Sequence, residues 1–380
     1  MSLTSSLSAV APFFAQEIVS WQKEYGRNHL PWQNTSDPYR VWLSEIMLQQ
    51  TQVNTVLEYF TRFLECFPTV TGLAEAHPDK VLGLWSGLGY YSRARNLHQC
   101  ARDVVTIHGG RFPSTSAALQ TLPGIGPSTA AAIASFCFAE RVAILDGNVK
   151  RVLTRVFGFS GDLAESRQIS KLWKLAADLP PKERLQETMP RYTQGLMDLG
   201  ATVCTRRKPQ CDRCPVKGIC RGFAEGTPEK YPVKTKKLRR SAQNLSLLWA
   251  RRPDGSVWLE RRPISGIWGG LYCFPAFESY EAVSKFLPGR LAFGAEALQP
   301  FVHVLTHKDL LLEPIVTAFE QTDEMPTPSV PTMSTSGNWF SADAWRVLGL
   351  PAPIRKLLLS DCVRQRELAF NAANQAHDGV

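Results

Sequence analysis

Residues 122–130 read Leu-Pro-Gly-Ile-Gly-Pro-Ser-Thr-Ala and continue as Ala-Ala-Ile-Ala-Ser-Phe over 131–136. Two glycines in a tight turn before a helix leave backbone N–H groups exposed at the positive end of that helix. Such a turn accepts a phosphate without reading any base. Gly124, Gly126 and Ser128 are therefore candidate phosphate-binding residues, although an ordinary connection between two helices has the same kind of sequence.

The chain on both sides of this turn is predicted to be helical. From residue 10 to about 225, apolar residues recur with helical spacing between short polar or Pro/Gly breaks. A helix is expected over 42–60, and Asp37 before Pro38 has the character of a helix cap just upstream. Further helices are predicted at 72–77, 79–85, 91–109, 115–121, 127–139, 147–157, 167–178 and 184–199.

The pattern changes after the Pro- and Lys-rich segment that ends at residue 240. Short β-type runs follow at 244–252, 256–262, 301–319 and 338–341, with turn signals between them. The length of 380 residues also favours more than one domain. We expect a mainly α N-terminal region, 1–225, and an α+β domain, 242–366. A basic linker, 226–241, would join them, and 367–380 would be a tail.

Four of the nine cysteines are bunched, at Cys204, Cys211, Cys214 and Cys220. Their thiolates can surround one metal centre. Zinc sites usually space their ligands as two separate pairs, whereas four cysteines in one short loop suit a compact 4Fe–4S cluster better. Iron–sulfur is thus the preferred interpretation, zinc remains an alternative, and the expected role of the centre is structural.

Positive charge is concentrated around this loop. The formal net charge is +9, and residues 204–240 hold 12 Lys and Arg against 3 Asp and Glu. This one stretch therefore carries the whole excess, which favours a polyanionic partner, although a solvated linker is the alternative. No apolar run approaches the roughly 20 residues of a membrane span, and the N-terminus lacks a secretory signal.

A second turn lies about twenty residues after the first. Residues 145–151 read Leu-Asp-Gly-Asn-Val-Lys-Arg. Asp146 in isolation would be interpreted as the N-cap of the helix that follows. Glu45, in the segment Trp-Leu-Ser-Glu-Ile-Met-Leu-Gln-Gln-Thr over 42–51, would likewise be interpreted as an exposed helical residue.

Together these motifs resemble the helix–hairpin–helix, iron–sulfur family of DNA glycosylases over residues 10 to 222. Within it, the blocks at 42–53, 84–98, 144–153 and 197–211 resemble the MutY-type adenine glycosylases. Enzymes of the endonuclease III type have a nucleophilic lysine in the second half of the hairpin motif. This chain has Ser128 there, so the Schiff-base route to strand cleavage lacks its amine.

The resemblance implies roles for individual residues. Glu45 would be the general acid on N7 of adenine, which requires a raised pKa at neutral pH. Asp146 would stabilise the cation on the deoxyribose, through a covalent sugar intermediate, with Asn148 holding that region. Two carboxylates of unequal pKa suit glycosidic cleavage.

Further residues would contact the DNA. Asp198 would lie near the adenine edge. Gln50, Leu88 and Tyr90 would enter the base stack around the mispaired guanine, offsetting the cost of unstacking. The adenine pocket would be lined by Leu30, Trp32 and Gln33, whose alternative is apolar packing ahead of the next helix.

The C-terminal domain resembles the MutT-like, Nudix-fold domain of the same family over its block at 261–275. The acidic REx2EE run of a Nudix hydrolase is absent, so recognition without pyrophosphatase chemistry is expected. The family's Phe-Ser-His element, which meets 8-oxoguanine, is here Leu305-Thr306-His307. Threonine keeps the hydroxyl, whereas leucine loses the aromatic face.

We therefore expect a monomeric, intracellular enzyme, cytoplasmic or nucleoid-associated, that binds double-stranded DNA. It would excise adenine opposite 8-oxoguanine or guanine in base excision repair. Three alternatives compete with this hypothesis: an endonuclease III-like pyrimidine glycosylase with lyase activity, a non-catalytic iron–sulfur DNA-binding protein, and a Nudix-type hydrolase. Ser128, the pair Glu45 and Asp146, and the missing acidic run argue against them in turn.

Overall fold

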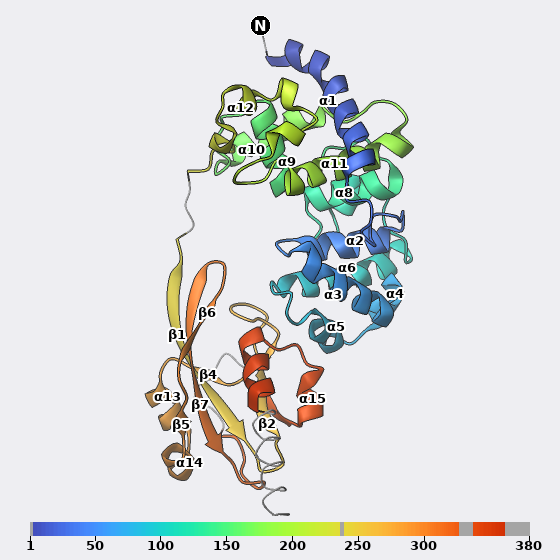
Figure 1. Ribbon diagram of the computed structural model, residues 1–380. Coiled ribbons are helices and arrows are strands. Elements are labelled where there is room, and N and C mark those ends of the chain that lie inside the picture. The colour runs from blue at the N-terminus through green and yellow to red at the C-terminus, as the bar shows by residue number, and fades with distance from the viewer. Residues whose placement is uncertain (1–2, 236–238, 327–336, 362–380) are drawn as a thin grey trace, which may run out of the picture. The chain divides into compact units, whose positions relative to one another are not determined.

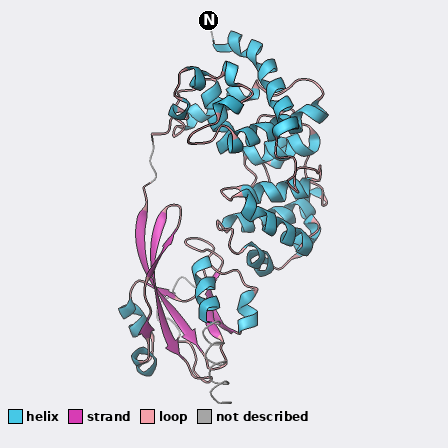
Figure 2. Cartoon of the chain, viewed as in Figure 1, coloured by secondary structure: helices cyan, strands magenta, loops and turns pink. Residues whose placement is uncertain are grey.

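The computed structural model describes residues 3–235, 239–326 and 337–361. It divides the chain into two compact units. Unit 1 comprises Met1–Glu75 and Asn96–Lys237, and unit 2 comprises Ala76–Arg95 and Leu238–Val380. Helices make up the described secondary structure of the first, and the sheet lies in the second (Figures 1 and 2). The tail predicted at 367–380 lies outside the described residues.

Apart from the helix expected over 42–60, the predicted helices are confirmed, with ends shifted by a few residues. Asp37 caps α2 as expected, because its side chain accepts a hydrogen bond from the backbone N–H of Tyr39. The helices assigned to the first 230 residues are α1 (Leu3–Tyr25), α2 (Pro38–Leu48), α3 (Val53–Cys66), α4 (Val70–Glu75), α5 (Pro78–Trp85), α6 (Ser92–His108), α7 (Ser116–Leu119), α8 (Pro127–Phe138), α9 (Gly147–Val156), α10 (Ser166–Ala177), α11 (Leu185–Thr202) and α12 (Arg221–Ala224).

The prediction of a single helix over 42–60 was wrong. The chain leaves the helical conformation after Leu48 and starts again at Val53. Between them Gln50 has φ of +59°, in the left-handed region that side chains other than glycine rarely adopt. The apolar spacing runs through this break, so periodicity alone could not detect it.

The helix–turn–helix at 116–138 forms as predicted. Gly124 has φ of +77°, and Gly126 is the residue before α8, with Pro127 in the first turn. Ile125 is buried while both glycines are exposed. The turn therefore presents backbone at the surface and anchors itself through one apolar side chain.

Unit 1 is held by a core between α1, α8, α9 and α11. Buried apolar side chains of these helices meet in one cluster, and three cysteines of the bunched set, Cys204, Cys214 and Cys220, pack against it. None of the described helices is long and apolar enough to cross a membrane.

Unit 2 contains one mixed sheet. Among the described residues its strands are β1 (Ser241–Arg251), β2 (Val257–Arg261), β3 (Tyr272–Cys273), β4 (Ala276–Phe277), β5 (Glu296–Ala297), β6 (Phe301–Val304), β7 (Lys308–Ala318) and β8 (Gly337–Phe340). β1 and β7 pair in parallel, with Ser241 opposite Lys308, and the other pairs are antiparallel. The helices α13 (Tyr280–Phe286) and α14 (Gly289–Phe293) cover buried side chains of β1 and β7.

The run at 301–319, which we predicted as one β-type stretch, forms two strands. β6 and β7 make a hairpin whose turn is Leu305-Thr306-His307. The Leu305 backbone N–H donates to the Lys308 carbonyl at 2.8 Å. The lesion-reading element proposed from the sequence is therefore the exposed tip of a hairpin.

Candidate active site and metal centre

A cavity of about 650 Å³ opens between α1, the 28–35 loop, α2, α8 and α11. Six carboxamide side chains lie among its lining residues. Carboxamides both donate and accept hydrogen bonds, and can therefore pair with the edge of a nucleobase. The lining includes Gln22, Asn28, Trp32, Gln33, Asn34, Ser44, Glu45, Phe136, Gln186 and Gln194.

Glu45 is the carboxylate that lines this cavity from α2. Trp42, Ile46 and Met47 of the same helix are buried around it. Burial raises the pKa of Glu45 to about 8, and the nearby negative charge of Asp146 contributes to the increase. The side chain therefore carries its proton at neutral pH, as a general acid must.

Asp146 caps α9, because its Oδ1 accepts a hydrogen bond of 2.7 Å from the Val149 backbone N–H. Burial raises the pKa of Asp146. Hydrogen bonds from the backbone N–H groups of Val149 and Asn148, and the charges of Arg151 and Lys150, act in the opposite direction. The capping interpretation and the catalytic one are thus compatible in this residue.

The two carboxyl groups have different surroundings. Burial favours the neutral form of both side chains, but Asp146 also has donors and cations that favour its anion, whereas the causes acting on Glu45 all favour its neutral form. One can therefore give a proton while the other stabilises a positive charge. Such a pair supports acid-assisted cleavage of a glycosidic bond.

Arg151 connects this pair to the cysteine loop. Its guanidinium donates to Asn148 Oδ1 at 2.9 Å, to the Gly200 carbonyl at 2.6 Å and to the Cys204 carbonyl at 2.8 Å. Asn148 is therefore held in place from α11 and from the first cysteine. Sequence reasoning missed Arg151, because nothing local distinguishes it from the basic residues expected at a DNA-binding surface.

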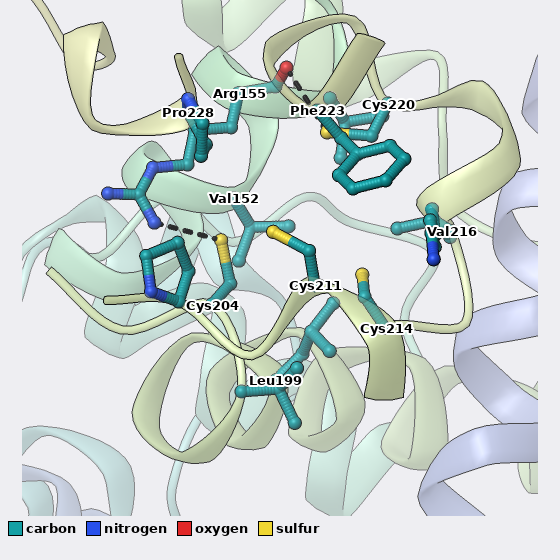
Figure 3. Close-up of a pocket in the computed structure, with 14 residues that line it drawn as sticks. Val152, Arg155, Leu199, Cys204, Cys211, Cys214, Val216, Cys220, Phe223 and Pro228 are labelled. Atoms are coloured by element: carbon teal, nitrogen blue, oxygen red, sulfur yellow. Dashed lines mark hydrogen bonds between the residues drawn. The ribbon is translucent and has the colours of Figure 1, made fainter. Parts of the chain in front are cut away.

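The four bunched cysteines line one cavity (Figure 3). Apolar residues of α9 and α11, with Val216, Phe223 and Pro228, complete its wall. Neighbouring cysteines raise the thiol pKa of Cys211, Cys214 and Cys220 behind the larger effect of burial, so thiolates gathered here require a cation. The chemistry of this wall, sulfur with apolar side chains, fits an iron–sulfur cluster.

Zinc was the alternative that the cysteine spacing left open. In the part of the chain that the structure describes, no group of three or more His, Cys, Asp or Glu side chains is set to hold one metal ion. The same four cysteines do surround a common cavity. Four thiolates around one cavity are the ligand set that a 4Fe–4S cluster would take.

Arg155 is the buried cation of this centre. Only 2% of it is exposed. Its guanidinium donates to Cys204 Sγ at 3.4 Å (Figure 3). It also donates to the carbonyls of Thr205, Arg206 and Tyr231 at 2.7, 3.1 and 3.2 Å. Cys220 Sγ in turn lies 3.5 Å from the Arg155 carbonyl oxygen. Arg155 therefore fixes the first cysteine and the chain leaving the loop.

Arg155→Met is expected to destabilise unit 1 and to lower its metal content. Methionine keeps the length of the side chain but leaves three carbonyls without their donor, at a cost of about 3–5 kcal/mol. Since each kcal/mol shifts Tm by about 2–4 °C in a domain of this size, Tm should fall by about 6–20 °C. Thermal unfolding and iron analysis measure the two effects. Exposed Arg206→Met is the control, and an equal loss in both variants would contradict the assignment.

Two surfaces could hold phosphates. One is the turn at Gly124 and Gly126, where the first N–H groups of α8 have no partner within the helix. Ser128 lies in the first turn of α8 and is half-buried. The other surface is the cysteine loop, whose exposed cations are Arg206, Arg207, Lys208, Arg213 and Arg221.

Two of the three residues expected in the adenine pocket line the cavity, and the third is buried beside them in the sequence. Trp32 and Gln33 line the cavity. Leu30 is buried at 3% exposure and Trp32 packs edge-on against Phe60, with ring centroids 5.3 Å apart. The Nε2 of Gln33 is buried, and none of the described protein groups accepts its hydrogen bond. A bound base could supply that acceptor.

Asp198 lies behind the cavity. It forms an ion pair of 2.7 Å with Arg27 Nε, and its other oxygen accepts the Arg27 backbone N–H at 2.9 Å. Gln194 Nε2 also donates to it, at 2.8 Å. With both oxygens engaged, Asp198 anchors the 26–34 segment, while Gln194, one turn earlier, lines the cavity. Its helical spacing from Asp198 could have indicated Gln194 from the sequence.

The residues expected to enter the base stack lie on two short loops. Gln50 is exposed, and Tyr90 has 41% of its surface exposed and φ of +48°. Backbone held in this region is typical of functional loops. Leu88 is buried at 6% exposure, so it would have to move to meet DNA. Tyr90 lies in unit 2, where its hydroxyl is hydrogen-bonded to that of Thr306 at the hairpin tip.

Three family models match the chain. Residues 43–177 match the HhH-GPD superfamily base excision DNA repair protein, and 204–220 match the iron-sulfur binding domain of endonuclease III. Residues 246–360 match the NUDIX domain. The hairpin and the cysteine loop thus lie within matched regions, and the cavity takes Ser44, Glu45 and Phe136 from the first of them. The chain carries a 4Fe–4S cluster, and the four cysteines of the matched loop are its candidate ligands.

Curated relatives match across most of the chain. The adenine DNA glycosylase of Buchnera aphidicola subsp. Acyrthosiphon pisum is 35% identical over 347 residues, which are 91% of this chain and 96% of that protein. The human adenine DNA glycosylase is 43% identical over 217 residues, 55% of this chain and 39% of that protein. Among solved structures, a thermostable thymine-DNA glycosylase matches with a TM-score of 0.50 and 27% identity, covering 59% of this chain and 100% of that one.

Proposed function

The chain belongs to the adenine DNA glycosylases of base excision repair, and from this membership we propose that it excises adenine paired with 8-oxoguanine or guanine and leaves an uncut abasic strand. The observation that carries the proposal is the pair Glu45 and Asp146. Glu45, with a pKa of about 8, lines a cavity rich in carboxamides, and Asp146, the N-cap residue of α9, interacts with it electrostatically.

The reaction begins with the extruded adenine in this cavity. Neutral Glu45 gives its proton to N7 of the base, and the electrons of the N-glycosidic bond move into the purine ring as the bond breaks. Glutamate is left as the anion. Trp32 and Gln33 hold the base, and the unmatched amide of Gln33 supplies a donor. Protonation is required because an unprotonated purine is a poor leaving group.

The deoxyribose cation that remains is stabilised by Asp146, whose anion is favoured by its N–H donors and by Arg151. Asn148, fixed by Arg151, holds this side of the site. Water finally adds to C1′ and loses a proton to the Glu45 carboxylate, which gives the abasic sugar and restores the neutral acid. The cluster supplies no step here: it folds the basic loop, and the cations of that loop bind phosphates.

Ser128 supports a reaction without strand cleavage, since it has no amine to form a Schiff base with the sugar. Thr306 and Tyr90 support recognition of the opposite base, because both hydroxyls are exposed near the hairpin tip. We further propose that the enzyme acts as a monomer. In this proposal the chain consists of a helical glycosylase region, 1–225, a basic linker, 226–241, and a recognition domain, 242–366.

Single-turnover assays on four duplexes test the proposal. Adenine should be released from A:8-oxoguanine and A:G, neither an A:T nor a thymine glycol duplex should react, and the product strand should break only after alkali. Ser128→Lys provides a comparison for borohydride trapping. Cleavage of thymine glycol, or breakage without alkali, would instead favour the endonuclease III-like alternative.

A further inference from the structure

The segment Ala76–Arg95 packs with the C-terminal sheet, although it lies inside the region 43–177 that matches the glycosylase superfamily. It contains α5 and the loop that ends in Tyr90. Part of the catalytic sequence is thus held by the domain that the chain adds after its linker. The contacts that hold it lie at both ends of α5.

At the start of α5, Asp79 forms an ion pair with Arg261 on β2. Tyr272 on β3 donates its hydroxyl to the other oxygen of Asp79 at 3.5 Å. The Arg261 guanidinium lies 5.2 Å from the centre of the Tyr272 ring. Asp79 is 20% and Arg261 33% exposed, so this pair is shielded more than the usual surface ion pair.

At the end of α5, the chain approaches the segment at 346–355 closely. A Cβ on Gly83 would stand 2.1 Å from the Val347 carbonyl oxygen, so only glycine fits there. Ser86 Oγ and Tyr91 Oη donate to the Leu350 carbonyl at 3.0 and 3.2 Å. The loop that bears Tyr90 is therefore tied to the C-terminal domain on each side.

Between these ties the loop is stiff. Buried Arg93 donates to the carbonyls of Leu88 and Gly89 at 3.1 and 3.3 Å and lies against the rings of Trp85 and Tyr90. A displacement of α5 would therefore move Tyr90 with it. Such a displacement would also change the distance from Tyr90 to Thr306.

We propose that Asp79 and Arg261 form an ionic latch through which the C-terminal domain positions Tyr90 against Thr306, and thereby sets the discrimination between 8-oxoguanine and guanine opposite adenine. Both are positioning residues, since neither needs to touch the DNA. The inference rests on the proposed function. It assigns lesion specificity to a contact inside the protein as well as to the residues at the hairpin tip.

The test compares Asp79→Asn, Arg261→Gln and the charge-swapped double variant Asp79→Arg/Arg261→Asp. Each single change should reduce the ratio of excision rates on A:8-oxoguanine and A:G by about five- to tenfold, which corresponds to roughly 1–1.4 kcal/mol. The A:G rate should stay within about twofold, and the swapped variant should recover most of the ratio. Arg290→Gln, which breaks ion pairs with Glu320 and Asp323 in the same unit, is the matched control and should leave the ratio unchanged.

Thermal unfolding of every variant separates positioning from folding. If Asp79→Asn fails to fold, Arg261→Lys keeps the charge while losing the planar fork, and should give a smaller decrease. A wild-type enzyme that releases adenine from neither duplex would overturn the proposed function, whereas one that releases it equally from both would overturn the latch. A wild type that prefers it, with folded latch variants that keep the full ratio or a swapped variant that recovers nothing, would overturn the latch alone.

Discussion

Glu45→Gln is expected to lower the single-turnover rate of adenine excision by about 10²–10⁴-fold, the usual contribution of a general acid. Glutamine has the same shape but no proton to give to N7. Because the neutral amide replaces a carboxylic acid that is already neutral below pH 8, the cavity should keep its structure. Affinity for an A:8-oxoguanine duplex should accordingly change by less than about threefold, or roughly 0.7 kcal/mol.

The control for this variant is Glu58→Gln, which removes an exposed glutamate from α3 and should leave the rate unaltered. Both variants need binding measured beside excision. Loss of DNA affinity in Glu45→Gln with substantial cleavage remaining would show that Glu45 holds DNA and that another group is the acid.

The pH profile of the wild-type enzyme gives an independent check. Since the pKa of Glu45 is raised from 4.5 to about 8, its acid form persists at neutral pH and is lost as pH increases through 8. The value of kcat/KM should therefore be nearly level up to about pH 7.5 and then fall by about tenfold per pH unit. A decrease that starts near pH 5 would mean that Glu45 is ionised in the working enzyme.

Local signals were sufficient for much of the fold and site. The Asp37 cap, the turn at Gly124 and the four cysteines each depend on residues within about twenty positions of one another, and the structure has these features in place. Short-range patterns of this kind reflect backbone and ligand geometry directly. Family resemblance then indicated Glu45 and Asp146, which isolated sequence patterns would have assigned to helix surface and helix cap.

Contacts between distant parts of the chain could not be predicted. Arg155 reaches Tyr231 across 76 positions, and Asp79 meets a strand residue far along the chain, Arg261. Charged residues at such positions have no periodic signature. The break at Gln50 was missed because the helical spacing of apolar residues continues from α2 into α3 and does not reveal a left-handed residue between them.

Long-range contacts of this kind bear on the proposed reaction because they hold Asn148 and Arg151 in fixed positions beside Asp146. Asn148 is hydrogen-bonded to Arg151, and Arg151 is hydrogen-bonded to the carbonyl of Cys204, a proposed cluster ligand. The cluster loop therefore supports the sugar-binding side of the site through hydrogen bonds while remaining outside the chemistry. Preorganised groups of this kind stabilise a developing charge without reorganising during the reaction.

Asp146→Asn tests that charge separately from the fold. Asparagine caps helices about as well as aspartate, so the hydrogen bond to the Val149 N–H and the start of α9 should persist. What is lost is the negative charge facing the deoxyribose cation, and we expect excision to slow by about 10²–10³-fold. Mispair affinity and Tm should remain near those of the wild type, which single-turnover kinetics, binding and thermal unfolding together establish.

Asp146→Asn should also change the other carboxyl group. Since the charge of Asp146 contributes to the raised pKa of Glu45, its removal should shift the alkaline limb of the residual activity to lower pH. Asp37→Asn, the same substitution at the cap of α2, is the matched control and should change neither rate nor profile. A large decrease in Tm beside the loss of activity, or an alkaline limb that stays at its wild-type pH, would contradict this role. Asp146 would then serve only as the N-cap of α9, and another group would have to stabilise the cation.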